Sequence, residues 1–215
     1  MTLALHSVGL RLGDRTLVTP FSLAVAAGEI VTLMGASGSG KSSLLSFIGG
    51  DLAGPIEGAG EILVDGHPVN DLPPERRRIG RLFQDDFLFP HMTVGENLLF
   101  GMAGRDREER HARMARALAG AGLEGFADRP PHTLSGGQRA RAALLRSLLA
   151  EPRVMLLDEP FARLDMDLRQ AMRGFVFQNL AERKIATLLV SHDRGDGPAD
   201  GRVLRLSSTG EIGDD

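Results

Sequence analysis

The chain has 215 residues, of which 42% are hydrophobic and 25% are charged, and its formal net charge is −3. These values are ordinary for a globular protein with one substantial core. A small negative charge provides no bulk attraction for nucleic acid, so no nucleic-acid partner is expected. The sequence contains no cysteine, which excludes disulfides and any cysteine-based metal site or nucleophile. It begins without a secretory signal, and its apolar runs fall far short of the ~20 residues of a membrane span, so we expect a soluble protein.

Short runs rich in Val, Ile and Leu alternate along the chain with longer segments of helical periodicity. The expected strands are Leu3–Val8, Phe21–Val25, Ile30–Met34, Glu61–Val64, Ile79–Phe83, Val154–Leu157, Thr187–Val190 and Arg202–Leu206. The expected helices are Lys41–Gly49, Val94–Phe100, Arg107–Ala121, Gln138–Ala150 and Met166–Glu182. Continuous apolar runs such as VMLL and TLLV are typical of parallel strands buried on both faces, whereas the alternating first strands indicate an antiparallel flank.

These patterns predict one α/β domain over residues 1–215. Its core, with a parallel sheet and an antiparallel β flank on the N-terminal side, is expected from residues 1–86 and 151–215. No strand is evident in residues 87–150, which we interpret as an inserted helical lobe. The arginine run Arg76–Arg78 is expected to form a solvated turn and not a nucleic-acid patch.

A glycine-rich segment, GASGSGKSS, lies between an expected strand and an expected helix. It matches GxxxxGK[ST] in the strand-to-helix context that a phosphate-binding loop requires. Glycines let backbone N–H groups surround phosphate oxygens, Lys41 can reach the terminal phosphates, and the Ser42 hydroxyl can ligate Mg²⁺. The expected nucleotide-binding residues of this loop are Gly35, Ala36, Ser37, Gly38, Ser39, Gly40, Lys41, Ser42 and Ser43.

Two carboxylates, Asp158 and Glu159, follow the apolar run VMLL. Ligands and metals gather at the carboxyl ends of such strands. Asp158 can hold the Mg²⁺ shell through water. Glu159, which strand alternation would point to the other side, can polarise a water for in-line attack on a terminal phosphate. Alone the pair could simply end a sheet, but the complete phosphate loop in the same chain favours the catalytic interpretation.

A second glycine pair, in LSGGQRARAALLRSLL, precedes another helical segment. Glycines before a helix usually form a phosphate cradle, so the chain carries two such segments. Together, GASGSGKSS, LSGGQ and LLDEP resemble the nucleotide-binding subunit of ATP-binding cassette (ABC) transporters over essentially the whole chain. The resemblance extends to Gln84 in LFQDD, the glutamine loop; to Asp165 in ARLD, the dimer loop, where the family more often has SALD; and to His192 in VSHD, the switch histidine.

The resemblance implies an Mg-dependent ATPase with ATP and Mg²⁺ as its ligands. Gln84 would contact the metal with Ser42 and Asp158, and His192 would donate to the γ-phosphate. Two copies would dimerise head to tail around two ATP molecules, so that each LSGGQ meets the ATP held by the other copy. The residues that would do so are Ser135, Gly136, Gly137 and Gln138.

One position departs from the family pattern. Where an aromatic side chain usually stacks on adenine, this chain has Leu12, and it contains no Tyr and no Trp. Adenine would therefore rest on an aliphatic surface, helped by stacking of Arg11 or Arg15. The substitution puts base selectivity in doubt but not triphosphate binding.

The segment FLFPHMTV, which contains Phe87 and Phe89, resembles the part of importer ATPases that receives a helix of the membrane subunit. Simple core packing of the lobe is the alternative. The short chain is most similar to the ATPases of the thiamine, molybdate, sulfate and iron importers. Its expected partners are a second copy, membrane permease subunits and, indirectly, a periplasmic or surface solute-binding protein, with the ATPase peripheral on the cytoplasmic face of the inner membrane. The alternative functions are an exporter or lipid-handling ATPase, and a non-transport cassette ATPase.

Overall fold

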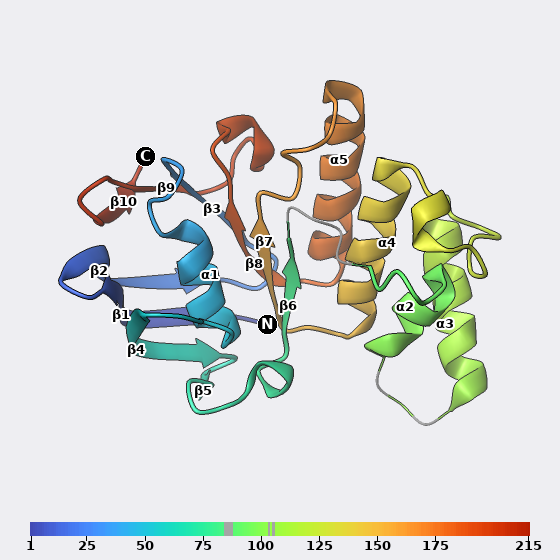
Figure 1. Ribbon diagram of the computed structural model, residues 1–215, viewed down its shortest axis with the longest axis horizontal. Coiled ribbons are helices and arrows are strands. Elements are labelled where there is room, and N and C mark those ends of the chain that lie inside the picture. The colour runs from blue at the N-terminus through green and yellow to red at the C-terminus, as the bar shows by residue number, and fades with distance from the viewer. Residues whose placement is uncertain (84–87, 103, 105) are drawn as a thin grey trace. The chain divides into compact units, whose positions relative to one another are not determined.

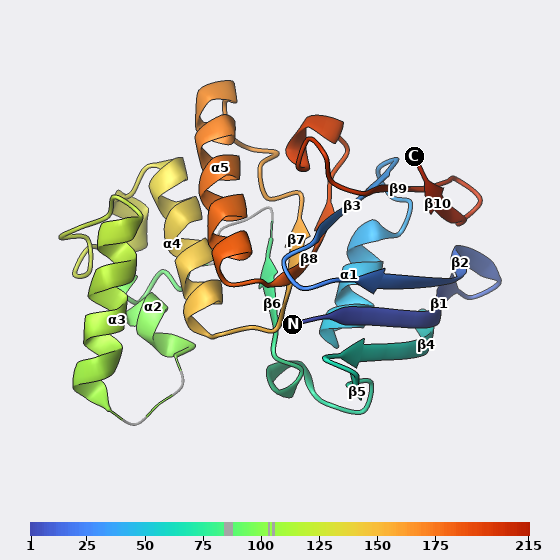
Figure 2. The same cartoon turned by 180° about the vertical axis from the view of Figure 1, so that it is seen from behind.

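The computed structural model describes residues 1–83, 88–102, 104 and 106–215 (Figures 1 and 2). Gln84 and Phe87, both singled out above, lie outside the described residues. The chain divides into two compact units, each described here by itself. The β-rich unit comprises Met1–Arg81, Arg153–Glu159 and Asn179–Asp215, and the helical unit comprises Leu82–Pro152 and Pro160–Gln178. The helical unit thus takes in residues 160–178 in addition to the segment 87–150 discussed above.

The N-terminal part of the β-rich unit is a four-stranded antiparallel sheet with the order β2-β1-β4-β5. Its strands are β1 (Leu3–Leu12), β2 (Arg15–Val25), β4 (Ile56–Val64) and β5 (His67–Pro68). The antiparallel flank was expected, but the first two strands and β4 are longer than predicted and β5 was not predicted. Strand β1 continues past Val8 because it pairs with β2 and β4 as far as Leu12. Register shifts on both sides of Val8 interrupt the alternation of its side chains, so the sequence pattern ends earlier than the strand.

The second sheet has the order β10-β9-β3-β8-β7-β6. Strands β3 (Ile30–Gly35), β8 (Ala186–Val190), β7 (Val154–Asp158) and β9 (Val203–Leu206) pair in parallel, as their apolar sequences predicted. Strand β10 (Ile212–Asp214), which was not predicted, pairs antiparallel with β9, and β6 (Ile79–Leu82) follows β7 at the other edge.

Helix α1 (Lys41–Gly49) follows β3 directly and belongs to the same core. Its Leu44, Leu45 and Ile48 side chains are buried with apolar residues of both sheets. Burial of Leu or Ile side chains stabilises a fold by about 1.5–3 kcal/mol each. This packing fixes the helix and with it the glycine loop that precedes it.

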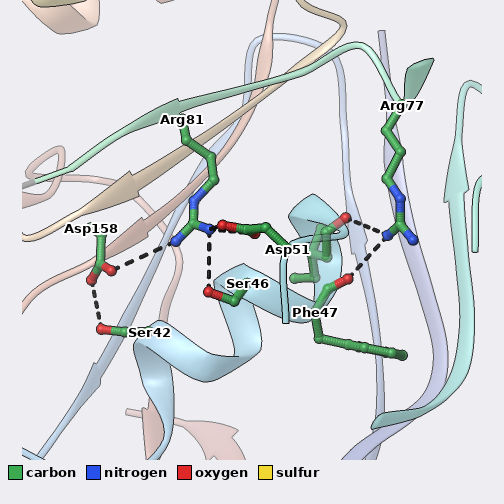
Figure 3. A network of polar contacts seen from close by, with 8 residues as sticks. Ser42, Ser46, Phe47, Asp51, Arg77, Arg81 and Asp158 are labelled. Atoms are coloured by element: carbon green, nitrogen blue, oxygen red, sulfur yellow. Dashed lines mark hydrogen bonds and ion pairs between the residues drawn. The ribbon is translucent and has the colours of Figure 1, made fainter. Parts of the chain in front are cut away.

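Arg77 departs from the solvated turn predicted for the arginine run. Its side chain is only 7% exposed. It donates a hydrogen bond to the carbonyl oxygen of Phe47 at the end of α1 (Figure 3). Further hydrogen bonds go to the carbonyl oxygens of Ile48, Leu72 and Asn70. The last carbonyls of a helix lack intrahelical partners, and a guanidinium has enough donors to satisfy several of them. Arg77 therefore caps α1.

The helical unit contains α2 (Val94–Phe100), α3 (Arg107–Gly120) and α4 (Gly136–Leu149), and most of α5 (Met166–Glu182). Its core consists mainly of buried aliphatic side chains, among them Val94, Leu98, Leu118 and Leu145. No strand occurs among the described residues of segment 88–150. Short 3-10 helices cover Pro74–Arg76 and Arg194–Asp196 in the β-rich unit and Pro131–Thr133 in the helical unit.

Candidate functional site

The glycine loop connects β3 to α1 as the sequence predicted. Gly40 occupies the position before the helix with a φ of 105°, a conformation that residues with a Cβ atom rarely adopt. No side chain caps this helix end, so its first N–H groups face the loop, where the helix dipole favours an anion. The loop thus provides the donors and the field that a phosphate group needs.

Lys41 lies at the start of α1 with its side chain buried. Its Nζ atom donates hydrogen bonds to the carbonyl oxygens of Gly35 and Ala36, each at 2.8 Å. Burial lowers the pKa of Lys41, and the nearby carboxylates of Glu159 and Asp158 partly oppose that shift. A compact ammonium charge is therefore held over the loop, close to both acidic residues.

A cavity of about 310 Å³ opens beside the loop. Leu12 lines it, together with three residues that the sequence analysis did not assign to the lining: Arg15, Leu17 and Ile56. Arg15 had been considered only as an adenine-stacking residue. Leu12 is the cross-strand partner of both Arg15 on β2 and Ile56 on β4, which is why all three reach one cavity. The complete lining consists of Leu12, Arg15, Leu17, Ser37, Gly38, Gly40, Lys41, Ser42, Ser43, Ile56 and Glu159. Gly35, Ala36 and Ser39 belong to the loop but not to this lining.

Asp158 ends β7, and its Oδ1 atom accepts a hydrogen bond of 3.0 Å from the Ser42 hydroxyl (Figure 3). Burial raises the pKa of Asp158, while the Ser42 hydrogen bond and the Arg81 guanidinium partly counteract it. A carboxylate and a hydroxyl are the hard oxygen ligands that Mg²⁺ prefers, so this pair fits the metal. The described residues contain no cluster of three or more His, Asp or Glu side chains that could hold a metal by themselves.

Glu159 and His192 lie side by side in the β-rich unit. The Nδ1 atom of His192 is 3.3 Å from the Oε2 atom of Glu159, and the histidine is the more exposed of the two. Strand β7 ends one residue earlier, so the direction of Glu159 follows from its left-handed backbone, with a φ of 46°, and not from strand alternation. Its N–H donates to the carbonyl oxygen of Val190. Such strained backbones cost about 1–3 kcal/mol and concentrate at functional sites.

The turn that carries His192 is held by two residues that the sequence analysis missed. The buried Ser191 hydroxyl donates to Asp196 Oδ2 at 2.6 Å and accepts from the Asp193 N–H at 3.0 Å. Polar groups this deeply buried are stable only when paired. The spacing of Ser191 and Asp196 was the available signal, since short polar side chains of this kind close local turns.

The LSGGQ segment begins α4 in the helical unit. Ser135 is the residue before the helix, and its side chain accepts from the Gln138 N–H at 3.4 Å. Gln138 Oε1 in turn accepts from the Ser135 N–H at 2.9 Å, which completes a capping box. Gly136 is exposed and Gly137 is buried. The N–H groups of these two glycines therefore remain as the open donors of the helix start.

Asp165 has a structural role in the helical unit. Its Oδ1 atom accepts from the Leu168 N–H at 2.9 Å, which places Asp165 as the cap of α5. The side chain is nevertheless exposed. Met166 beside it has 84% of its surface exposed. The tip of this loop therefore leaves polar and apolar groups at the surface of the unit.

Phe89 lies in the segment that was predicted to dock a membrane subunit. Its ring packs against Phe100 at 4.9 Å in a T-shaped arrangement, and Arg146 lies over it at 5.2 Å. Phe100 is 64% exposed. Asn97 fixes the backbone of the segment, accepting from the Phe89 N–H and donating to the carbonyl oxygens of Phe89, Met92 and Thr93.

Among the described helices, none is long and apolar enough to cross a membrane.

Comparisons with known proteins place the chain in one family. The ABC transporter family matches residues 18–162. The chain is 45% identical over 210 residues to the ABC transporter ATP-binding protein YnjD of Escherichia coli K12, with 97% of each chain covered. It is 39% identical over 204 residues to the Fe(3+) ions import ATP-binding protein FbpC 1 of Pectobacterium atrosepticum, covering 94% of this chain and 57% of that protein. It is 41% identical over 212 residues to the spermidine/putrescine import ATP-binding protein PotA of Chromobacterium violaceum, covering 98% and 58%.

The fold agrees with that assignment. The structure superposes with a TM-score of 0.80 on the dimeric structure of MJ0796, a bacterial ABC transporter cassette, at 32% identity, with 98% of this chain and 96% of that chain covered. The chain spans little more than half of the two import ATP-binding proteins but nearly all of YnjD and of the cassette. The chain therefore belongs to the ABC transporter family and is an ATP-binding protein that hydrolyses ATP.

Proposed function

We propose that two copies of this chain hydrolyse ATP at shared sites and thereby drive solute import through membrane permease subunits. The observation that carries the catalytic part is the convergence of Lys41, Ser42, Asp158, Glu159 and His192 within the β-rich unit. Support for import comes from the iron and polyamine import ATP-binding proteins that the chain resembles.

In this proposal the glycine loop and Lys41 hold the triphosphate, while Ser42 and Asp158 hold Mg²⁺ with Gln84, whose structure is not described. Bound Mg²⁺ would supply positive charge against the phosphate oxygens. Glu159 orients the attacking water as general base, since its carboxylate lines the cavity beside Lys41. His192 lies beside Glu159 and would hold the terminal phosphate by donating a hydrogen bond to it.

The second glycine pair serves the other copy. Ser135 and Gln138 form reciprocal hydrogen bonds between their side chains and backbone N–H groups. The N–H groups of Gly136 and Gly137 would therefore be the ones that bind the γ-phosphate of ATP held by the partner copy. Asp165 would lie in the same interface. The dimeric structure of a similar cassette supports this arrangement.

The permease would dock at the segment around Phe89, whose neighbour Phe100 presents an exposed aromatic ring. The chain would reach the membrane through that partner, peripherally and on the cytoplasmic face. A periplasmic or surface solute-binding protein would deliver the solute to the permease. No nucleic acid takes part in this scheme.

The proposal is tested with Glu159→Gln, which keeps the shape of the side chain but removes the base. We expect it to bind ATP with Mg²⁺, to hydrolyse at least ~100-fold more slowly, and to elute as an ATP-dependent dimer in size-exclusion chromatography. Glu124→Gln, at an exposed position in the helical unit, is the control and should resemble the parent chain. A Glu159→Gln chain that stays monomeric and turns over at the parental rate would remove Glu159 from this role.

A further inference from the structure

Arg81 of β6 reaches the carboxylate that is proposed to hold Mg²⁺. Its side chain is only 11% exposed, and its Nη2 atom lies 4.0 Å from Asp158 Oδ2 (Figure 3). The other oxygen of the same carboxylate, Oδ1, receives the Ser42 hydrogen bond. Asp158 therefore lies between a hydroxyl on one side and a permanent positive charge on the other.

The guanidinium is held in place from its opposite side. Its Nη1 atom is 2.5 Å from both carboxylate oxygens of Asp51, directly after α1, and 3.2 Å from the Ser46 hydroxyl within that helix. Figure 3 shows the guanidinium aligned between the carboxylates of Asp51 and Asp158. An arginine keeps its charge at any pH at which a protein is folded, so this cation is a fixed part of the site.

We propose that Arg81 is a positioning residue that weakens and orients the Mg²⁺ site formed by Ser42 and Asp158. The inference rests on the metal site of the proposed function. A like charge about 4 Å from a metal-binding carboxylate opposes a divalent cation there, and partial burial reduces solvent screening. Asp51 offsets part of that effect by neutralising the far side of the guanidinium.

The arrangement has a functional consequence for the order of binding. While no metal is bound, Arg81 compensates the buried charge of Asp158 and keeps its Oδ1 atom turned to Ser42. Ser42 and Asp158 would then hold Mg²⁺ only together with further anionic oxygens that offset the repulsion, and triphosphate oxygens would provide them. The site is therefore tuned to take the metal together with the nucleotide and not before it.

The test measures ATP binding by calorimetry at a series of free Mg²⁺ concentrations, and reads the Mg²⁺ concentration that gives half of the metal-dependent gain in affinity. Arg81→Met removes the charge at similar length and should lower that concentration by roughly 5-fold or more. Arg81→Lys keeps the charge and should stay near the parent value. Asp51→Asn removes the counter-charge and should raise the concentration by roughly 2-fold or more.

Arg76→Met is the matched control, since it removes one positive charge from an exposed site shortly before β6. Asp158→Asn verifies the metal site and should abolish the Mg²⁺ dependence. If parental ATP binding does not respond to Mg²⁺, the metal site of the proposed function is wrong. If the parent responds and Arg81→Met shifts no more than Arg76→Met, only the role of Arg81 is wrong. Should Arg81→Met fail to fold, Asp51→Asn decides, and an unchanged half-saturating concentration overturns the proposal.

Discussion

Gly137 of α4 packs directly against Leu168 of α5 within the helical unit. A Cβ atom added to Gly137 would lie 2.4 Å from Leu168 Cδ1, whereas one added to the neighbouring Gly136 would meet only an Arg139 nitrogen at 3.9 Å. The two glycines of the LSGGQ segment therefore have different surroundings: a side chain would clash at Gly137 and would not clash at Gly136. Gly137 permits helix packing, and Gly136 leaves open space at the exposed helix start.

This difference predicts opposite results from two similar substitutions. Gly137→Ala should destabilise the chain by about 1–3 kcal/mol, because the added methyl forces Leu168 to move. Gly136→Ala should leave stability unchanged or slightly higher, yet weaken the ATP-dependent dimer when combined with Glu159→Gln. Urea unfolding and size-exclusion chromatography with ATP measure the two effects. Equal loss of stability in both variants would contradict the assignment.

A second prediction concerns the nucleotide base. The cavity beside the phosphate loop is lined at one end by Leu12, Leu17 and Ile56, with Arg15 beside them. These residues provide no aromatic surface, so we expect ATP to be preferred to GTP only modestly. Leu12→Tyr should tighten ATP binding by about 1 kcal/mol through stacking. Nucleotide titrations of the parent, Leu12→Tyr and the control Leu72→Tyr decide. A strong ATP preference in the parent would mean that another residue recognises adenine.

A third prediction concerns Asn97, which is fully buried. Its side chain accepts from the Phe89 N–H at 2.7 Å and donates to the Thr93 carbonyl at 2.9 Å, among others. Leu in its place would leave these backbone groups without hydrogen-bond partners, so Asn97→Leu should lower the unfolding free energy by about 1–3 kcal/mol. Thermal unfolding measures the loss, and the control is Glu96→Gln, at an exposed position of the same helix, which retains the α2 capping box. A loss of unfolding free energy no larger than that of Glu96→Gln would show that the Asn97 hydrogen bonds do not stabilise the segment around Phe89.

The fourth prediction follows from the raised pKa of Asp158, whose main cause is burial. A carboxyl whose pKa is higher in the folded state is better accommodated protonated, so its contribution to stability falls as pH rises through that folded pKa. Asp158→Asn, which is neutral at every pH, should therefore unfold at a higher temperature than the parent at pH 7. The gap should narrow as pH falls and close below the ordinary value of 3.8. Thermal unfolding from pH 4 to 7 tests this. A difference in unfolding temperature between Asp158→Asn and the parent that grows as pH falls would contradict the prediction.

The helices were largely predictable because their limits are local. Lys41–Gly49, Val94–Phe100 and Met166–Glu182 have the predicted bounds, and each has a start that the neighbouring residues specify. Helix α4 begins at Gly136, two residues before the predicted start, although the capping box of Ser135 and Gln138 was present in the sequence. The two glycines have low helix propensity, but the cap places them inside the helix.

Strand limits and site neighbours were less predictable because they depend on pairing. Strand β1 extends to Leu12 because it pairs with β2 and β4 as far as that residue, and β10 is defined by its pairing with β9. The motif residues Ser42 and Asp158 were identified from their own sequences, and the structure brings them into contact. Ile56 and Arg81 carry no motif. The pairing of β4 with β1 brings Ile56 to the cavity, and the position of β6 beside β7 brings Arg81 to Asp158.

The hydrogen bonds of Lys41 to the carbonyl oxygens of Gly35 and Ala36 close the glycine loop into a ring. Much of the conformational entropy of the loop and of this long side chain is thus lost during folding and not during nucleotide capture. The loop therefore acts as a rigid receptor. Nucleotide affinity should respond more to the charges around it than to mutations that stiffen or loosen the loop.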